Sequence, residues 1–132
     1  MDEPKTFTFD NQEYSPGNFG DTYSNKPVTL RDAIVHSLNV VTVDVAMEVT
    51  IGRVMNLAAK AGLPKPPRAY PAMALGTSEA TPLQIASAYT AFANLGSRTT
   101  PIAINRITTG EGVTVAAPTS QRSEVLLSLI HI

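Results

Sequence analysis

The sequence predicts an α+β fold in which several helices are joined by loops and two short β-hairpins. Helices are indicated by threonine caps that precede apolar residues at helical spacing. Hairpins are indicated by apolar residues that alternate with polar ones around turn-forming residues. Hydrophobic residues make up 43 % of the 132 residues and charged residues 16 %, which suits a packed core. A chain of this length corresponds to one domain or to part of a larger one.

The composition excludes several classes of partner and site. The formal net charge of −1 gives no reason to expect nucleic acid or an anionic membrane surface as a partner. The absence of cysteine excludes disulfides and cysteine metal sites. There is no run of about 18 apolar residues to predict a transmembrane helix, and residues 1–4 do not begin a signal peptide. Taken as a complete protein the chain would be expected in the cytosol, whereas for a fragment we expect any export signal or membrane anchor to lie upstream of Met1.

The two predicted hairpins lie in the first and last thirds of the chain. In the first hairpin, polar and apolar residues alternate over residues 6–9. The turn-forming residues 10–13 follow, and the apolar Tyr14 comes after them. In the second, the apolar runs at residues 102–107 and 113–115 flank a Gly-Glu-Gly turn. Both are expected to be short antiparallel pairs.

A helix is predicted to begin at Leu30, because Thr29 and Asp32 form a Thr-x-x-acid capping signal. Apolar residues then continue at helical spacing, at Leu30, Ala33, Ile34, Leu38 and Val41. The valine-rich run over residues 40–45 also has the propensity of a strand. Apolar residues on nearly all sides fit a buried helix, and we predict a helix here.

Glycine and proline mark where the chain is irregular. Residues 15–27 form a polar loop with two prolines and two glycines. Thr50 is a candidate cap for a helix that ends near Ala61, with Gly62 as its stop signal. Four prolines within residues 64–71 then enforce a non-helical connection.

The clearest helix signal begins at Thr81. Thr81 is the cap, Pro82 occupies the first helical position, and Gln84 closes a capping box. Gly96 ends the helix. Its apolar residues form a broad surface made of Leu83, Ala86, Tyr89, Ala91, Phe92, Ala93 and Leu95.

The candidate chemistry lies in a Ser-x-Asn motif formed by Ser37, Leu38 and Asn39. Extending the apolar stripe of the preceding helix places Ser37 beside Ala33 and Ile34, on the side that faces the core. A buried hydroxyl there costs about 1–3 kcal/mol unless it finds a partner. The simpler alternative is structural: the Ser37 hydroxyl bonds to a carbonyl of its own helix, and Asn39 caps the next helix.

Five short patterns follow one another along the chain: Pro16…Asn18-Phe19, Val28-Thr29-Leu30-Arg31, Ser37-Leu38-Asn39, Ala74-Leu75-Gly76 and Thr81-Pro82-Leu83. In this order they resemble the transpeptidase domain of class A penicillin-binding proteins, which cross-link peptidoglycan. The resemblance covers roughly residues 2–115 and implies the α+β transpeptidase fold shared with β-lactamases, represented mostly by its helical lobe. On this basis we assign residues 1–125 to a partial transpeptidase domain and regard residues 126–132 as an atypical tail.

The resemblance implies a serine acyl-transfer mechanism that needs no cofactor or metal. In this family the serine of a Ser-x-x-Lys motif attacks the D-Ala-D-Ala stem peptide, or a β-lactam, and becomes acylated. By this mapping Ser37 is the proton relay beside that lysine, and Asn39 orients the peptide backbone of the substrate. A Lys-Thr-Gly strand binds the substrate carboxylate and lines the oxyanion site.

Two of these three catalytic motifs are absent from the sequence. No serine has a lysine three positions later, and no Lys-Thr-Gly occurs. The nucleophile motif is therefore expected upstream and the Lys-Thr-Gly strand downstream, so we expect the chain alone to be inactive. We interpret Thr108-Thr109-Gly110, the nearest imitation of the latter, as a hairpin turn. Tyr23-Ser24-Asn25 imitates the Tyr-x-Asn motif of β-lactamases, but it lies in a loop, and we interpret it as a chance match.

The remaining polar candidates have structural interpretations. His36 and His131 lack neighbours at ligand spacing, so we expect no metal site. Glu79 lies next to the Thr81 cap and is expected to interact with the helix dipole rather than to act as a general acid.

The complete protein implied by the resemblance also carries a glycosyltransferase and acts at the extracytoplasmic face of the cytoplasmic membrane. Two alternatives stay open. The first is a non-enzymatic binding or assembly domain derived from the same fold, with the helix at residues 83–95 as its interaction face. The second is a fragment of a class B penicillin-binding protein, which shares the Thr-Pro-Leu helix. The Ala-Leu-Gly-Thr sequence at residues 74–77 favours class A.

Overall fold

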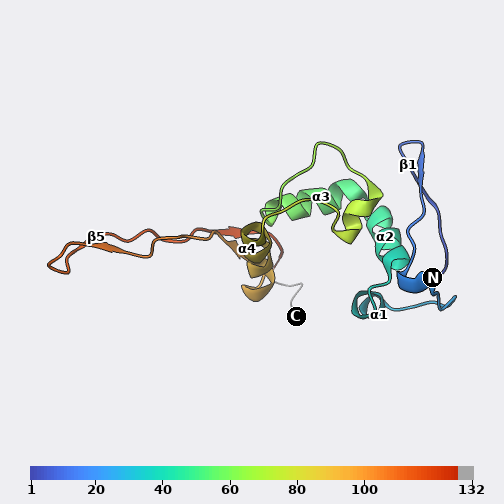
Figure 1. Cartoon of the computed structure of the whole chain (residues 1–132), viewed down its shortest axis with the longest axis horizontal. Helices are drawn as coiled ribbons and strands as arrows, with labels where there is room; N and C mark the ends of the chain where they lie inside the picture. Colours follow the sequence, from blue (N-terminus) through green and yellow to red (C-terminus); the bar gives the residue numbers. More distant parts are fainter. Residues whose placement is uncertain (128–132) are drawn as a thin grey trace. The chain divides into compact units, whose positions relative to one another are not determined.

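The computed structural model describes residues 1–127, which divide into two units (Figure 1). Unit 1 comprises Met1–Asn56 and Lys65–Glu79, and unit 2 comprises Leu57–Pro64 and the chain from Ala80 onward. His131 and most of the predicted tail lie outside the described residues. Both units combine helices with short strands, so the predicted α+β class is confirmed. Within residues 1–127, no helix has the length and apolar character needed to cross a bilayer.

Unit 1 begins with the first predicted hairpin. Its strands pair in antiparallel fashion, with Phe7 opposite Tyr14. Asp10 and Asn11 have φ angles of 48° and 60°, the left-handed conformation that a two-residue type I′ turn requires. The elements of the unit are β1 (Phe7–Phe9), β2 (Gln12–Tyr14), the 3-10 turn η1 (Phe19–Asp21), α1 (Leu30–Val35), α2 (Asn39–Glu48), the first part of α3 (Ile51–Lys60) and the 3-10 helix η2 (Pro71–Leu75).

The core of unit 1 is built around α2. Val40 and Val43 are fully buried and pack with Phe7 of the hairpin. Ala46, at the other end of α2, packs with Ile51 and Met55 of α3. The valine-rich run is therefore a helix buried on several sides, as predicted, because its neighbours cover it and override the strand propensity of valine.

The helix predicted after Thr50 is also present. The Thr50 carbonyl accepts hydrogen bonds from the N–H groups of Arg53 (3.0 Å) and Val54 (3.3 Å) at the start of α3. Gly62 follows the helix with a φ of 91°, the left-handed conformation that is typical of a helix stop. The guanidinium of Arg98 occupies the space where a Cβ at Gly62 would lie, so glycine is needed there for room as well.

Unit 2 contains the capped helix predicted at Thr81. The Gln84 N–H donates to the Thr81 hydroxyl (3.2 Å), and the Thr81 N–H donates to the Gln84 side-chain carbonyl (2.8 Å), which completes the capping box. The elements of the unit are the second part of α3, α4 (Pro82–Ala93), β3 (Ser97–Thr99), β4 (Ile107–Thr108), β5 (Thr114–Ala116) and β6 (Arg122–Glu124).

The strands of unit 2 form two antiparallel pairs. The predicted hairpin is present as β4 and β5, although β4 keeps only the last residue of the apolar run at residues 102–107. A second pair joins β3 to β6, with Ser97 opposite Glu124, and encloses the first. Sequence reasoning missed this pair, because its strands are polar and lie far apart in the sequence, with the other hairpin between them.

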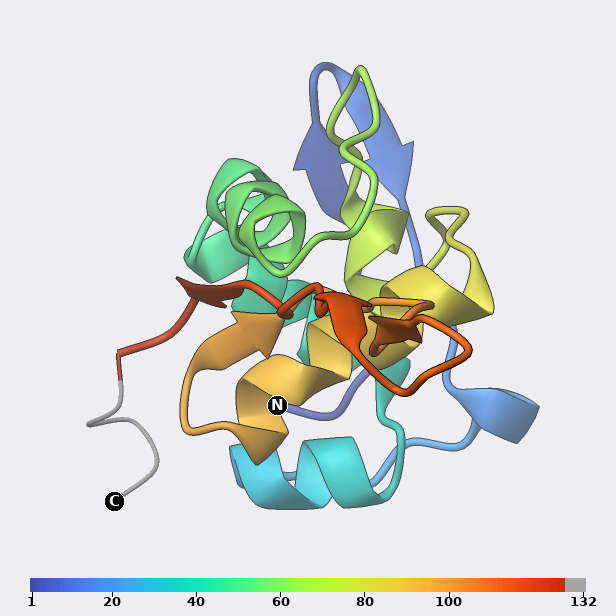
Figure 2. The same cartoon turned by 90° about the vertical axis from the view of Figure 1, so that its left-hand side faces the viewer.

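Hydrogen bonds between side chains and backbone hold β3 beside α4 (Figure 2). The Thr99 N–H donates to the Thr90 hydroxyl (2.8 Å), and the buried Ser87 hydroxyl donates to the Thr99 carbonyl (3.0 Å). α4 turns its small residues Ala88 and Ala91 inward. The predicted apolar surface is exposed at its largest members, which are Leu83, Tyr89, Phe92 and Leu95.

We expect Gly96→Ala to destabilise the chain by about 2 kcal/mol, because two effects act at this position. Gly96 has a φ of 100°, which a side chain makes costly, and an added Cβ would collide with the backbone carbonyl of Leu126. Urea unfolding measures the loss. Gly110→Ala is the matched control, because a Cβ at Gly110 meets nothing within 4 Å. Equal unfolding midpoints for the two variants would contradict the expectation.

Candidate functional site

The Ser-x-Asn motif lies in a sharp turn between two helices, not inside one helix (Figure 1). α1 ends at Val35, and α2 begins at Asn39. The Leu38 N–H donates to the Ala33 carbonyl (2.9 Å), and the Ser37 N–H donates to the Ile34 carbonyl (3.2 Å). This pair of bonds is a Schellman motif, in which the residue at the position of Ser37 is usually glycine. The prediction of one continuous helix from Leu30 past Val41 was therefore wrong.

Ser37 adopts the left-handed conformation that this motif requires, with a φ of 53°. For a residue with a side chain, that conformation costs about 1–2 kcal/mol relative to the right-handed one. Non-glycine residues held in this region occur preferentially at functional sites. Six other non-glycine residues of the described chain also have a positive φ, among them Thr50 after α2 and Leu95 after α4, so the strain at Ser37 marks a helix stop and does not by itself assign a role to its hydroxyl.

The side chain of Ser37 is exposed, which corrects the prediction that it faces the core. The prediction extended the apolar stripe of α1 through Leu38, but this stripe is mostly at the surface: Leu30 is 60 % exposed and Ile34 79 %. Because the helix stops before Ser37, the helical period no longer decides which way the side chain points. The sequence carries no glycine here that signals the stop.

Asn39 is the first residue of α2, and its side chain contacts the preceding loop. The Asn39 Nδ2 donates to the Gly17 carbonyl (2.8 Å), which fixes the position of the amide group. The structural alternative for this motif, a helical Ser37 and a capping Asn39, therefore does not describe it. Leu38 occupies the cap position, and no side-chain hydrogen bond caps the helix there.

The first turn of α2 is instead capped from the loop. The Val40 N–H donates to Oδ1 of Asn18 (3.3 Å), a residue 22 positions earlier in the chain. The Nδ2 of Asn18 donates to the Thr22 carbonyl (3.1 Å) and to the Asp2 carboxylate (2.6 Å). Asn18 belongs to one of the patterns that the sequence indicated, whereas Asp2 was missed. No local pattern around Asp2 signals a contact so far along the chain.

Asp2 carries a buried carboxylate, with 2 % of the residue exposed. Its Oδ2 accepts a hydrogen bond from the Ser24 N–H (2.8 Å). This bond, joined by the bond from Asn18, lowers the pKa of Asp2 below its ordinary value of 3.8 against the opposing effect of burial. The Tyr23-Ser24-Asn25 segment thus holds Asp2 through its backbone, in agreement with its interpretation as a loop.

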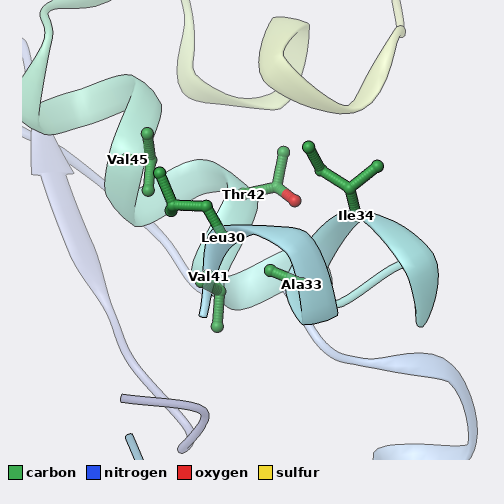
Figure 3. Close-up of a pocket in the computed structure, with 6 residues that line it drawn as sticks. All are labelled: Leu30, Ala33, Ile34, Val41, Thr42 and Val45. Atoms are coloured by element: carbon green, nitrogen blue, oxygen red, sulfur yellow. The ribbon is translucent and has the colours of Figure 1, made fainter. Parts of the chain in front are cut away.

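An apolar groove of about 160 Å³ lies between α1 and α2, beside the turn (Figure 3). The hydroxyl of Thr42, its one polar lining side chain, donates to the Leu38 carbonyl (2.9 Å). Side chains of this kind offer no partner to a charged or peptide substrate, so we do not assign the groove to the site. The lining residues are Leu30, Ala33, Ile34, Val41, Thr42 and Val45.

The other polar candidates lie elsewhere. Thr108 is the last residue of β4, and the Thr109 N–H donates to the Val113 carbonyl (2.8 Å), so Thr108-Thr109-Gly110 leads into the turn of the β4–β5 hairpin, close to the prediction of a hairpin turn. His36 is the C-cap residue that follows α1, and His131 lies outside the described residues. Among residues 1–127, no group of three or more His, Asp or Glu side chains is placed to share a metal ion.

Comparison with protein families gives one match that spans most of the chain. The model of the penicillin binding protein transpeptidase domain matches residues 2–126. Penicillin-binding protein 2D of Bacillus subtilis is 31 % identical over 115 residues, and penicillin-binding protein 1A of Aquifex aeolicus is 37 % identical over 118 residues. Each match covers 87 % of this chain, which spans 17 % and 16 % of these two relatives.

Solved structures show the same likeness. Penicillin-binding protein 1A of Haemophilus influenzae matches with a TM-score of 0.81 at 26 % identity, over 91 % of this chain and 18 % of that one. Penicillin-binding protein A of Mycobacterium tuberculosis, in a structure described as an imipenem acyl-enzyme complex, matches with a TM-score of 0.82. That match covers 99 % of this chain and 35 % of the other at 18 % identity, so it bears on the fold alone.

We expect Ser37→Gly to stabilise the chain by about 1 kcal/mol, because glycine removes the cost of the left-handed backbone. Ser37→Ala is the matched control, since it removes the same hydroxyl but keeps the Cβ and therefore the strain. Thermal unfolding of the three chains measures the difference. A Ser37→Gly chain no more stable than Ser37→Ala would show that the strain at this position is absent in solution.

The hydrogen bonds of Asp2 also make stability depend on pH. The pKa of Asp2 is lower in the folded chain than in the unfolded one, so its contribution is fully present above pH 3.8 and is lost as the pH falls below that value. We expect Asp2→Asn to cost on the order of 1–3 kcal/mol at pH 7. This cost should shrink as the pH falls below 3.8. A cost that stays constant across that range, in unfolding measured at several pH values, would contradict the assignment.

Proposed function

Because the chain belongs to the family of penicillin-binding protein transpeptidase domains, we propose that it forms the middle part of a peptidoglycan D,D-transpeptidase. In this proposal residues 1–125 are part of that domain, and the complete enzyme cross-links stem peptides through a serine acyl-enzyme. The single observation that carries the assignment of a site is the presence, in one turn, of an exposed Ser37 hydroxyl and an Asn39 amide that the Gly17 carbonyl holds in place.

Ser37 acts as a proton relay. The nucleophilic serine, supplied by a Ser-x-x-Lys motif outside this sequence, attacks the carbonyl carbon of the penultimate D-Ala and loses its proton to the neighbouring lysine. The Ser37 hydroxyl passes a proton onward to the amine of the departing D-Ala. A hydroxyl suits this step because it donates and accepts at once, and the exposed turn leaves it reachable from solvent.

Asn39 positions the substrate. One hydrogen of its amide is committed to the Gly17 carbonyl, so the plane of the group is fixed before substrate binds. The other amide hydrogen and Oδ1 then provide one donor and one acceptor, which match the C=O and N–H of a peptide backbone. A group held in advance loses little entropy on binding, which favours correct orientation of the scissile bond.

The complete protein is proposed to act at the cell envelope, on the extracytoplasmic face of the cytoplasmic membrane. It binds peptidoglycan stem peptides and is acylated by β-lactams at the serine that this sequence lacks. Its sequence relatives named penicillin-binding protein 1A support a class A enzyme with an additional glycosyltransferase domain. In this proposal no step involves a metal or a cofactor.

The test is a chimera in which residues 2–126 of this chain replace the matching segment of the Aquifex aeolicus relative, which supplies the missing motifs. We expect covalent labelling by a fluorescent penicillin, and a roughly 100-fold slower acylation for Ser37→Ala or Asn39→Ala. Ser123→Ala and Asn56→Ala, at exposed positions outside the proposed site, are the matched controls. The 132-residue chain on its own should form no adduct, because it has no Ser-x-x-Lys.

Two outcomes would contradict the proposal. One is a chimera that unfolds cooperatively, is labelled, and acylates at the same rate with or without the Ser37 hydroxyl and the Asn39 amide. The other is a heat-sensitive covalent adduct with the 132-residue chain alone, which would place a nucleophile within this sequence.

A further inference from the structure

The buried carboxylate of Asp2 is the charged group of the described residues whose burial most needs an explanation. A carboxylate is rarely buried unless other groups compensate its charge, because it loses its hydration. Asp2 is 2 % exposed, whereas the carboxylates that form the ion pairs of unit 1, Asp10 and Asp44, are partly exposed. Burial of the Asp2 carboxylate therefore costs free energy, and the packing of the apolar core does not explain why it is buried.

The carboxylate is held by two hydrogen bonds from different places. Oδ1 accepts from Nδ2 of Asn18 (2.6 Å), and Oδ2 accepts from the Ser24 N–H (2.8 Å). The backbone of Asp2 is fixed as well, since its N–H donates to the Lys26 carbonyl (3.1 Å) and its carbonyl accepts from the Asn25 N–H (2.9 Å). Asp2 is thus a rigid acceptor with a defined direction.

This acceptor decides which way the amide of Asn18 points. A side-chain amide has one end that donates and one that accepts, and the two ends differ little in shape. The Asp2 carboxylate and the Thr22 carbonyl both require the donating end, so Oδ1 must face the Val40 N–H. With the amide reversed, two acceptors would face Oδ1, and the NH₂ group would face the N–H of Val40.

The orientation matters because the start of α2 has no cap of its own. Leu38 provides no side-chain oxygen, so the Asn18 carbonyl is the group that satisfies the Val40 N–H. The neighbouring residue of the same loop, Gly17, accepts from Asn39. The loop therefore holds α2 at two adjacent residues, one of which is Asn39 itself.

We propose that Asp2 is a positioning residue for the Ser37–Asn39 turn. Its carboxylate orients the amide of Asn18, which holds the first turn of α2 and thereby sets the place of the Asn39 side chain. The importance of this turn for catalysis rests on the proposed function. The positioning does not, because it can be measured in the 132-residue chain without substrate.

The first test is nuclear magnetic resonance of Asp2→Asn, with Glu3→Gln as the control that removes the adjacent negative charge. In Asp2→Asn the carboxylate acceptor is gone, and only the Thr22 carbonyl still requires the donating end of the Asn18 amide. We expect the Val40 amide to exchange its hydrogen about tenfold faster, and the side-chain NH₂ resonances of Asn39 to move. Glu3→Gln should match the wild type. A folded Asp2→Asn chain with unchanged Val40 exchange and Asn39 resonances would overturn the inference.

The second test exchanges the two side chains and remains decisive if Asp2→Asn does not fold. In the double variant Asp2→Asn with Asn18→Asp, the new amide at position 2 can donate to the new carboxylate at position 18. That carboxylate can still accept from the Val40 N–H, although the bond to the Thr22 carbonyl is lost. We expect Asn18→Asp alone to bring two carboxylates together and to be worse than the double variant. Absence of any rescue in Val40 exchange or in unfolding midpoint would overturn the inference.

The same variants in the labelling chimera separate the two proposals. If Asp2→Asn slows acylation and the exchanged pair restores part of the rate, the positioning role extends to the reaction. If Ser37→Ala and Asn39→Ala leave acylation unchanged, the proposed function fails, while the resonance measurements still decide the role of Asp2. If Asp2→Asn leaves the Asn39 resonances unchanged, the positioning role fails whatever the chimeras do.

Discussion

The contact between the loop at residues 16–24 and the first turn of α2 determines where the Ser-x-Asn motif lies. α1 stops at a Schellman motif, and α2 starts without a side-chain cap at Leu38. The backbone groups left over at such a junction must find partners elsewhere, because unpaired N–H groups are costly when buried. The loop supplies these partners through Asn18 and Gly17, so a helix junction that would otherwise be weak becomes a defined turn.

The turn combines a strained backbone at Ser37 with hydrogen bonds from residues far away in the sequence. The left-handed backbone at Ser37 destabilises the chain, and a glycine at that position would relieve the strain. The burial of the Asp2 carboxylate also costs free energy, which its hydrogen bonds offset. Both costs fall at the same junction, because the left-handed backbone completes the stop of α1 and the hydrogen bonds of Asp2 and Asn18 hold the start of α2. The strain at Ser37 and the buried network below it are therefore two parts of one arrangement.

Unit 2 is stabilised in a different way. α4 carries its own capping box and packs small residues inward, so its formation depends little on its large apolar side chains. Those side chains, among them Tyr89 and Phe92, lie at the surface of the described residues. The polar groups of α4 instead bind β3, and β3 in turn pairs with β6. Hydrogen bonds of side chains with backbone thus add to the packing of small residues along this helix.

The sequence by itself determined the features that depend on neighbours a few positions apart. The caps at Thr29 and Thr81 and the two hairpin turns, near Asp10 and near Gly110, all arise from interactions of this range. The first turn is tighter than the predicted one at residues 10–13, since Gln12 and Glu13 belong to β2. The order of the short patterns also sufficed to indicate the family, because several weak signals in sequence are specific together. Tertiary structure was not needed for either result.

Only the tertiary structure decided the geometry of the site. The local pattern predicted a continuous helix and a buried Ser37, and the structure contradicts both. The pattern gave no indication that β3 pairs with β6. The helical period predicted a buried Ser37, since it assumes that the helix continues. The helix stops instead, and the groups at its junction bond to residues such as Asn18, 22 positions away from Val40. A contact between residues so far apart in the sequence produces no periodic pattern. It depends on where the folded chain places the two residues and not on the number of residues between them.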